Sequence, residues 1–316
     1  MESVIKSKNN RLLILGGGFI GTYLAKEAIL RGFEVSILSK NFKPLSQTLH
    51  GIEYFNIDVR KRDELANFFK NKIFHHVINL CGYVDHSNYF DEGHKVIDVH
   101  MIGTKNVVNC INRESLISFI QIGSSDEYGN HPAPQSENLR ELPMSSYSFA
   151  KTASTHFLKM LNLTENFPAV ILRPFLVYGP GQKNSRFIPQ IIQGCLNDLD
   201  FPVSHGEQLR DFCFISDITE AIFLALNNSN IHGEIINIAS GKPVSIKEVV
   251  VMIQNIIGSG RPKFGEVRYR VGENMALFAD ISKARKLLNW NPKIVLREGL
   301  VKTIESYQNQ NLINSI

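Results

Sequence analysis

The sequence has few cysteines, and they are not arranged in pairs. Cys81, Cys110, Cys195 and Cys213 are scattered along 316 residues, with no CxxC motif and no histidine at metal-ligand spacing. Disulfide frameworks and zinc sites both require such spacing. We therefore expect buried, reduced thiols, as is usual in the cytoplasm, and no bound metal.

Long hydrophobic runs are also missing. The apolar run Leu12–Leu15 is followed at once by glycines, which leaves it too short for the hydrophobic part of a secretion signal. No other stretch is apolar for long enough to cross a bilayer. These two absences predict a cytoplasmic protein that does not insert into a membrane.

Neither sign of charge dominates the sequence. The net charge is +4, with 20% charged and 43% hydrophobic residues. No block of Lys and Arg is dense enough to predict a nucleic-acid-binding face, although a mildly basic surface could help to attract an anionic ligand. The composition is typical of a globular enzyme, and the length suits one large domain or two smaller ones.

The first half of the chain alternates short apolar runs with helical patterns. Strands are predicted at Arg11–Leu15, Glu34–Leu38, Glu53–Ile57, His76–Leu80 and Ser118–Ile122, and helices at Ile20–Arg31, Arg62–Lys70 and Glu92–Asn112. This alternation predicts an α/β fold with a doubly wound, Rossmann-type parallel sheet. The strands are almost continuously apolar, as expected where both faces of a sheet are covered.

The pattern changes at about residue 173. Loops are predicted at Leu199–Arg210 and Gly258–Gly272, and one more strand is predicted at Ile235–Ala239. We therefore predict a first domain over residues 1–172, with a returning strand near residues 234–240. Residues 173–316 would mostly form a smaller second region, interleaved with the first.

A glycine-rich turn lies between the first strand and the first helix. Gly16, Gly18 and Gly21 form a GxGxxG pattern, with Phe19 and Ile20 at the helix start. Gly16 permits the tight turn, Gly18 lets a pyrophosphate approach the backbone, and Gly21 lets the helix pack closely on the strand. The helix N-terminus offers free N–H groups to the phosphates. A plain glycine turn is the alternative, but the strand–turn–helix context favours a bound dinucleotide.

The choice of dinucleotide depends on the end of the second strand. An NAD enzyme usually presents an acid there, whereas this chain has Ser39 and Lys40, which could accept a 2′-phosphate. NADP is therefore favoured over NAD, with a solvated lysine as the competing explanation. Asp58, followed by Val59, comes just after the third strand and could reach the adenine, although an Asp in a turn is common without a ligand.

Tyr147 and Lys151 are four residues apart, on one face of a predicted helix. An unperturbed tyrosine has a pKa of about 10, and a neighbouring ammonium and an oxidised nicotinamide would both favour the phenolate. Tyr147 is therefore a candidate acid/base, and Lys151 could also bind the nicotinamide ribose. Ser124, which follows the strand Ser118–Ile122, could donate to the same substrate oxygen. An exposed helical pair is the alternative.

These features resemble the extended short-chain dehydrogenase/reductase family, which includes sugar-nucleotide epimerases, dehydratases and 4-ketoreductases. The resemblance runs from Leu12 to about Tyr307. The glycine turn matches the family's GGxGFIG-like motif, one residue shorter before the last glycine. Asp58 matches the acid that contacts the adenine, and Leu80, Cys81 and Gly82 match the strand end beside the cofactor. His100 stands where the family usually has Asn, before a VxGTxN-like helix. Ser124, Tyr147 and Lys151 match the family's Ser-Tyr-Lys triad.

The second half of the chain carries further matches to this family. Segments such as Arg173-Pro174-Phe175 through Tyr178-Gly179-Pro180-Gly181 resemble its crossing into the substrate-binding region. The resemblance implies that Arg186, Arg210 and Arg270 contact a nucleotide-diphospho-sugar, and the fork of donors on arginine suits a diphosphate. It also implies a homodimer formed through helices near Glu92–Asn112 and Tyr147–Leu163. Val96, Val99, Val107 and Val108 suit such an interface or packing on the sheet.

The stretch Ser124–Tyr128 bears on the reaction. Dehydratases of the family read TDEVYG, and here Ser125 and Asp126 stand where they carry Asp and Glu, which argues against dehydration. The stretch resembles the SSEEYG of 4-keto-6-deoxymannose reductases. We therefore predict NADPH-dependent reduction of a 4-keto, 6-deoxy nucleotide sugar at C4. Ser125 would bind the substrate, and Asp126 would either transfer a proton or bind a sugar hydroxyl. A C4-epimerase with tightly held NAD is the alternative, and a non-catalytic NADP sensor is a third hypothesis.

Overall fold

The central element of the protein is a seven-stranded sheet. The computed structural model describes residues 10–40, 50–269 and 272–314, the last five of these as backbone only. The strand order is β10-β6-β5-β4-β1-β2-β3, and each pairing from β6 to β3 is parallel. The strands are β1 (Arg11–Leu15), β2 (Glu34–Leu38), β3 (Ile52–Phe55), β4 (His76–Asn79), β5 (Ser118–Ile122), β6 (Ala169–Pro174) and β10 (Ile235–Ile238).

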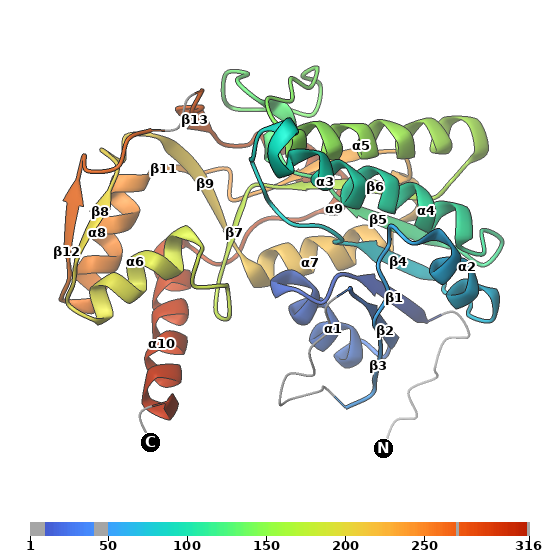
Figure 1. Cartoon of the computed structure of the whole chain (residues 1–316), viewed down its shortest axis with the longest axis horizontal. Helices are drawn as coiled ribbons and strands as arrows, with labels where there is room; N and C mark the ends of the chain where they lie inside the picture. Colours follow the sequence, from blue (N-terminus) through green and yellow to red (C-terminus); the bar gives the residue numbers. More distant parts are fainter. Residues whose placement is uncertain (1–9, 41–49, 270–271, 315–316) are drawn as a thin grey trace. The chain divides into compact units, whose positions relative to one another are not determined.

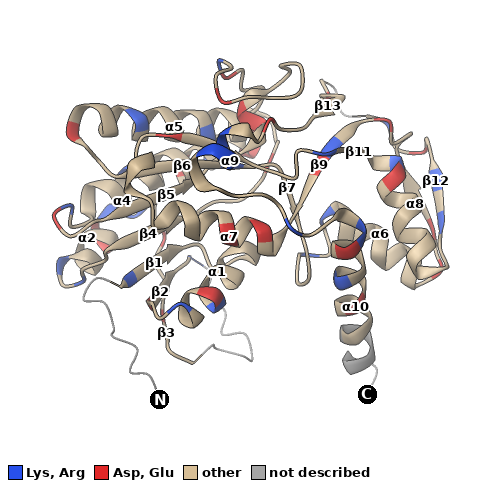
Figure 2. Cartoon of the chain, turned by 180° about the vertical axis from the view of Figure 1, so that it is seen from behind, with Lys and Arg blue, Asp and Glu red and all other residues tan. Residues whose placement is uncertain are grey.

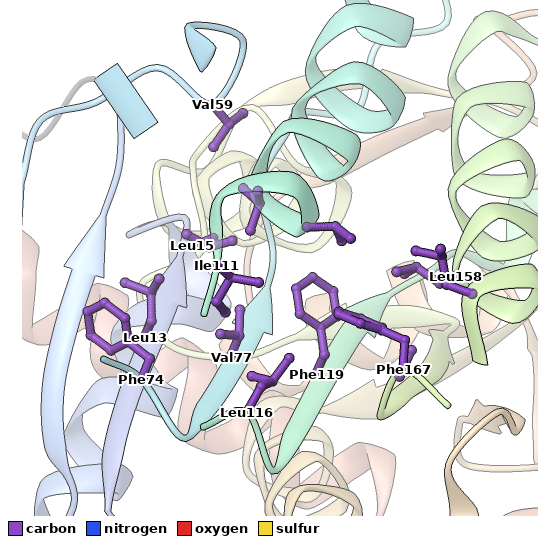
Figure 3. Close-up of a cluster of buried hydrophobic side chains, with 14 of the residues drawn as sticks. Leu13, Leu15, Val59, Phe74, Val77, Ile111, Leu116, Phe119, Leu158 and Phe167 are labelled. Carbon is purple, nitrogen blue, oxygen red and sulfur yellow. The ribbon is translucent and has the colours of Figure 1, made fainter. Parts of the chain in front are cut away.

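Helices cover both faces of this sheet, as Figure 1 shows. One face packs against α2 (Arg62–Lys70), α4 (Gly103–Cys110) and α5 (Ser146–Glu165), and its apolar core includes Leu13, Val77, Phe119 and Leu158 (Figure 3). The other face carries α1 (Phe19–Leu30) and α7 (Ile215–Leu226), where Arg31 lies 4.5 Å from the ring centroid of Phe223. The predicted fold class, a doubly wound Rossmann-type sheet, is confirmed.

The predicted long helix over Glu92–Asn112 is helical but not regular. Two π-helical turns, Tyr89–Gly93 and Asp98–Ile102, alternate with α3 (His94–Ile97) and α4. A π turn inserts one extra residue and so rotates the helix face that follows. Val96, Val107 and Val108 are buried and Val99 is partly buried. These valines therefore pack inside the chain itself. Of the two roles predicted for them, packing on the sheet is correct and a place in a dimer interface is not.

The chain divides into two compact units. The first unit comprises residues 1–129, 140–173 and 219–236, and the second comprises residues 130–139, 174–218 and 237–316. The described part of the second unit contains a four-stranded sheet in which β9 pairs with β11, β13 and β7, together with four helices and a strand pair. Its elements are β7 (Leu176–Tyr178), α6 (Phe187–Leu196), β8 (Asp200–Val203), β9 (Leu209–Phe214), β11 (Pro243–Ser245), α8 (Ile246–Ile257), β12 (Arg261–Phe264), β13 (Ala276–Leu277), α9 (Ser282–Leu288) and α10 (Leu296–Asn314).

The prediction of loops over Leu199–Arg210 and Gly258–Gly272 is wrong in part. Strands β8 and β12 lie within these segments and pair with each other in parallel. Their sequences, DFPV and RPKF, each contain a proline and at least one charged residue. Such residues are tolerated because a two-stranded sheet consists of edge strands only, where one side of each strand needs no ladder hydrogen bond.

Charges of both signs are spread over the described helices and loops, as Figure 2 shows for one view. None of the helices in the described part of the chain combines the length and the apolar character that a bilayer crossing needs. All four cysteines are free. Cys195 and Cys213 are buried, whereas Cys81 and Cys110 are only partly buried, so the prediction of buried thiols is correct for two of the four.

Candidate active site

The glycine turn lies where the strand order of the sheet reverses. β1 lies between β4 and β2, so the crossovers leave β1 and β4 in opposite directions. Open α/β sheets bind ligands at the carboxyl ends of the strands at such a reversal. Gly16 follows β1 with a φ of +106°, and a Cβ added to it would lie 3.1 Å from the Leu80 carbonyl carbon, just after β4. The turn therefore brings the predicted residues Gly16 and Leu80 together.

Gly18 and Gly21 have different surroundings within this turn. A Cβ on Gly21 would lie 2.1 Å from the Gly16 carbonyl oxygen, so α1 could not begin against β1 with any other residue there. A Cβ on Gly18 would meet no protein atom within 4 Å. The space over Gly18 and the first turn of α1, which starts at Phe19 and Ile20 without an acidic residue, fit a dinucleotide pyrophosphate.

The predicted adenine end of the site is a charged cluster. Arg60 donates from Nε to Asp58 Oδ1 at 3.0 Å and from NH2 to Asp58 Oδ2 at 2.6 Å. Lys40 Nζ lies 3.5 Å from the same Oδ2, and Ser39 is its half-buried neighbour. The side chain of Val59 is buried in the core, so only its backbone could face a ligand.

Asp58 gives the first testable prediction. Hydrogen bonding to Arg60 lowers the pKa of the Asp58 carboxyl from 3.8 to about 2. Because the folded chain holds this proton less tightly than the unfolded chain, the contribution of Asp58 to stability is present above about pH 4 and is lost as the pH falls towards about 2. Asp58→Asn should lower the free energy of unfolding by about 1 kcal/mol at neutral pH. This figure is reduced to allow for water around the half-exposed Arg60.

The check is urea denaturation of the ligand-free protein at several pH values. The difference between wild type and Asp58→Asn should shrink between about pH 4 and pH 2. A difference that stays constant over this range would show that the carboxylate pairing does not stabilise the fold.

The residues that follow β4 lie against His100, whose ring packs on the predicted catalytic residue Tyr147. Burial raises the pKa of the Cys81 thiol to about 12, so this group stays neutral. Gly82 has a φ of +120°, and a Cβ there would lie 2.0 Å from the His100 ring. Burial lowers the pKa of His100 to about 3, its Nε2 donates to the Tyr83 carbonyl at 3.1 Å, and its ring meets that of Tyr147 edge to face at 5.3 Å.

Tyr147 and Lys151 lie one turn apart on α5 and are both buried. Lys151 Nζ lies 5.9 Å from the Tyr147 ring centroid and donates to the Ile122 carbonyl, at the end of β5, at 2.7 Å. Burial lowers the pKa of Lys151 to about 8, which leaves the ammonium largely charged at neutral pH. An ammonium at this distance stabilises a phenolate, so the arrangement suits proton transfer by Tyr147.

Ser124 ends the extended stretch after β5 and caps the short 3-10 turn Ser125–Tyr128. Its Oγ accepts from the Asp126 N–H at 3.2 Å. Ser125 is buried, whereas Asp126 is half-buried and lies 3.7 Å from His86 Nε2. The His86 ring in turn lies 5.6 Å from the Tyr147 ring. The fold thus brings Asp126 to the surroundings of Tyr147, through a histidine that the sequence patterns did not indicate.

The sequence patterns did not indicate a buried ion cluster that contacts Ser124 through Glu127. Glu127 and Arg173 are both fully buried, and Arg173 NH2 donates to Glu127 Oε2 at 2.7 Å and to Glu141 Oε1 at 2.6 Å. The only sequence signal was a glutamate in SDEY and an arginine before Pro174, each of which reads as a surface residue by itself.

The predicted diphosphate-binding arginines fall in the second unit. Arg210 is buried on β9, pairs with Glu273 and donates from NH1 to the Leu209 carbonyl at 2.8 Å. Arg186 is exposed at the N-terminus of α6. Arg270 lies outside the described residues.

A glycine turn at the strand-order reversal, followed by a buried tyrosine–lysine pair beside β5, defines a Rossmann-fold protein of the extended short-chain dehydrogenase/reductase type. The profile of the NAD dependent epimerase/dehydratase family matches residues 12–239, and the chain belongs to that family.

Three similar proteins indicate the chemistry found within the family. A putative UDP-glucose 4-epimerase of Methanocaldococcus jannaschii is 29% identical over 95% of this chain and 99% of its own length. UDP-glucuronic acid decarboxylase 1 of Xenopus tropicalis is 27% identical over 95% of this chain and 72% of its own. The crystal structure of UDP-glucuronic acid 4-epimerase from Bacillus cereus, in complex with UDP-glucuronic acid and NAD, has a TM-score of 0.85 and 26% identity, over 95% of this chain and 99% of that one.

Proposed function

We propose that the protein is a UDP-sugar 4-epimerase that oxidises and re-reduces C4 with one retained dinucleotide. The observation that carries the proposal is the buried Tyr147–Lys151 pair on α5, 5.9 Å apart from ring centroid to ammonium, beside the strand end that bears Ser124. The full-length similarity to a UDP-glucose 4-epimerase and the resemblance to a UDP-glucuronic acid 4-epimerase support the substrate class.

The chain's own residues would handle the proton at the C4 oxygen. Tyr147 as phenolate takes the hydroxyl proton, while Ser124 donates a hydrogen bond to the same oxygen and orients it. Lys151 keeps the phenolate charged and would bind the nicotinamide ribose. A bound dinucleotide would supply a reversible hydride acceptor at C4, and the re-reduction requires the 4-keto sugar to present its other face. Tyr147 then gives the proton back, so no net oxidation results.

The glycine turn and Asp58 would hold the dinucleotide. Lys40 is exposed and within 3.5 Å of Asp58, so its charge is shared between that carboxylate and any ribose 2′-phosphate. We infer that the site accepts NADP through Ser39 and Lys40 and also accepts NAD, the cofactor in the Bacillus cereus complex. Arg210, with Arg186 and Arg270, would bind the diphosphate of the sugar nucleotide, and Asp126 would contact the sugar.

A homodimer through α5 is part of this proposal. Phe149, Met160 and Leu163 are 50%, 44% and 79% exposed. Their spacing of eleven and three residues places them along one side of the helix, which leaves an apolar stripe open to a second copy of the chain.

Product analysis tests the proposed reaction. The purified protein is incubated with UDP-glucose or UDP-glucuronic acid and no added dinucleotide, and the products are identified by proton NMR. The C4 epimer should accumulate to an equilibrium mixture, and the denatured protein should release NAD or NADP. Turnover of a 4-keto sugar nucleotide that consumes NADPH stoichiometrically would support the reductase predicted from the sequence instead. Loss of the C6 carboxylate from UDP-glucuronic acid would indicate a decarboxylase.

A further inference from the structure

We propose that Glu127 is a positioning residue that fixes Ser124 against the helix carrying Tyr147 and Lys151. Glu127 is fully buried on the turn that follows β5, so its side chain has no exposed surface with which to contact a substrate. The expected effect of Glu127 on kcat rests on the proposed function.

The carboxylate of Glu127 joins two separate segments. Oε1 accepts the Ser124 backbone N–H at 2.9 Å. Oε2 accepts the hydroxyl of Thr155 at 2.8 Å. Thr155 lies four residues after Lys151 and eight after Tyr147, so all three lie on the same side of α5. One side chain therefore sets the distance between the predicted serine and the predicted tyrosine–lysine pair.

The surrounding structure holds Glu127 in this role. Arg173 donates to Oε2 at 2.7 Å and lies 4.7 Å from the centroid of the Tyr128 ring. A Cβ on Gly123 would lie 2.6 Å from Glu127 Oε1, so only glycine leaves room for the carboxylate beside β5. A buried carboxylate with three donors, one of them a buried cation, has a single favourable orientation, because any other would leave charged atoms without partners.

Glu127 also balances the charge of the site. The cluster contains two cations, Arg173 and Lys151, and two carboxylates, Glu127 and Glu141. Burial lowers the pKa of Lys151, and the negative charge of Glu127 is the largest influence that opposes this. The titratable groups around Lys151 are Tyr147 on its own helix, Glu127 and Asp126 on the turn after β5, Cys81 after β4, and His100.

Glu127→Gln and Glu141→Gln form the test pair, since each removes one carboxylate from Arg173 but only Glu127 contacts Ser124. Glu127→Gln should lower kcat by about a hundredfold with little change in KM, because the serine loses its fixed position. It should also lower the pKa of Lys151 by about one pH unit, so that activity is lost at a lower pH. Glu141→Gln should leave both quantities near wild type.

Glu127→Asp separates the two effects. It keeps the charge, so the Lys151 pKa should return close to that of wild type, but its shorter side chain cannot span Ser124 and Thr155, so kcat should stay low. If Glu127→Gln does not fold, Thr155→Val removes only the α5 end of the link. That variant should lower kcat about tenfold with the Lys151 pKa unchanged.

The Lys151 pKa is measured without substrate, by NMR titration of isotope-labelled lysine ε-carbons assigned with Lys151→Met. This readout stands even if the proposed reaction is wrong, so the two failures are distinguishable. The inference is overturned if the Lys151 pKa in Glu127→Gln equals that of wild type. It is also overturned if Glu127→Gln and Glu141→Gln change kcat and the Lys151 pKa equally.

Discussion

Tyr147→Phe is expected to lower kcat by about a thousandfold while leaving the fold and dinucleotide binding intact. The substitution removes only the hydroxyl, and general acid/base groups contribute about 10²–10⁴-fold to a rate. The ring that packs at 5.3 Å from His100 and 5.9 Å from Lys151 Nζ remains. Thermal unfolding should therefore change little, since burial of the ring is preserved. The measurement is initial-rate kinetics of C4 epimerisation, with dinucleotide affinity determined by calorimetry.

Tyr54→Phe on β3 is the matched control, because it removes the same hydroxyl from a strand at the far edge of the sheet. It should retain wild-type kcat. If Tyr147→Phe turns over substrate within about tenfold of wild type, Tyr147 is not the acid/base, because the loss would fall below the usual contribution of such a group.

The glycine turn gives the second large effect, through two alanine substitutions that should fail in different ways. In Gly21→Ala the new methyl would lie 2.1 Å from the Gly16 carbonyl oxygen, a backbone atom. The start of α1 would have to shift, at a cost of about 3 kcal/mol in unfolding free energy, with loss of dinucleotide binding.

In Gly18→Ala the new methyl meets no protein atom within 4 Å, and the φ of −79° suits alanine. Thermal stability should stay at the wild-type level. Dinucleotide affinity should fall about 10–100-fold, because the methyl occupies the space through which the pyrophosphate approaches the backbone. Calorimetric titration with NAD and NADP checks both variants. Wild-type affinity in Gly18→Ala would mean that no phosphate lies over this turn.

The regular elements of the first half were predictable because their signals are local. The strand at Arg11–Leu15, the glycine turn and the helix that follows occupy adjacent positions in the sequence, and each agrees with the next. The same holds for Tyr147 and Lys151, whose spacing of four residues places them on one side of a helix wherever that helix packs.

The parts that were missed depend on distant residues. Glu127 and Arg173 are 46 residues apart, and their pairing exists only because β5 and β6 are neighbours in the sheet. Strands β8 and β12 each lack a strand-like pattern and are stabilised by each other across about sixty residues of sequence. The π turn at His100 has no sequence signature, because it is an extra residue accommodated by packing.

The central claim is that Tyr147 and a retained dinucleotide carry out a reversible oxidation at C4. The most direct measurement uses a UDP-sugar labelled with deuterium at C4, incubated with the protein and no added cofactor, and analysed by NMR. The account predicts that the C4 epimer forms with its deuterium still at C4, because the hydride that leaves is the one that returns. An epimer that has lost its deuterium, or no epimer from either UDP-glucose or UDP-glucuronic acid, would contradict it.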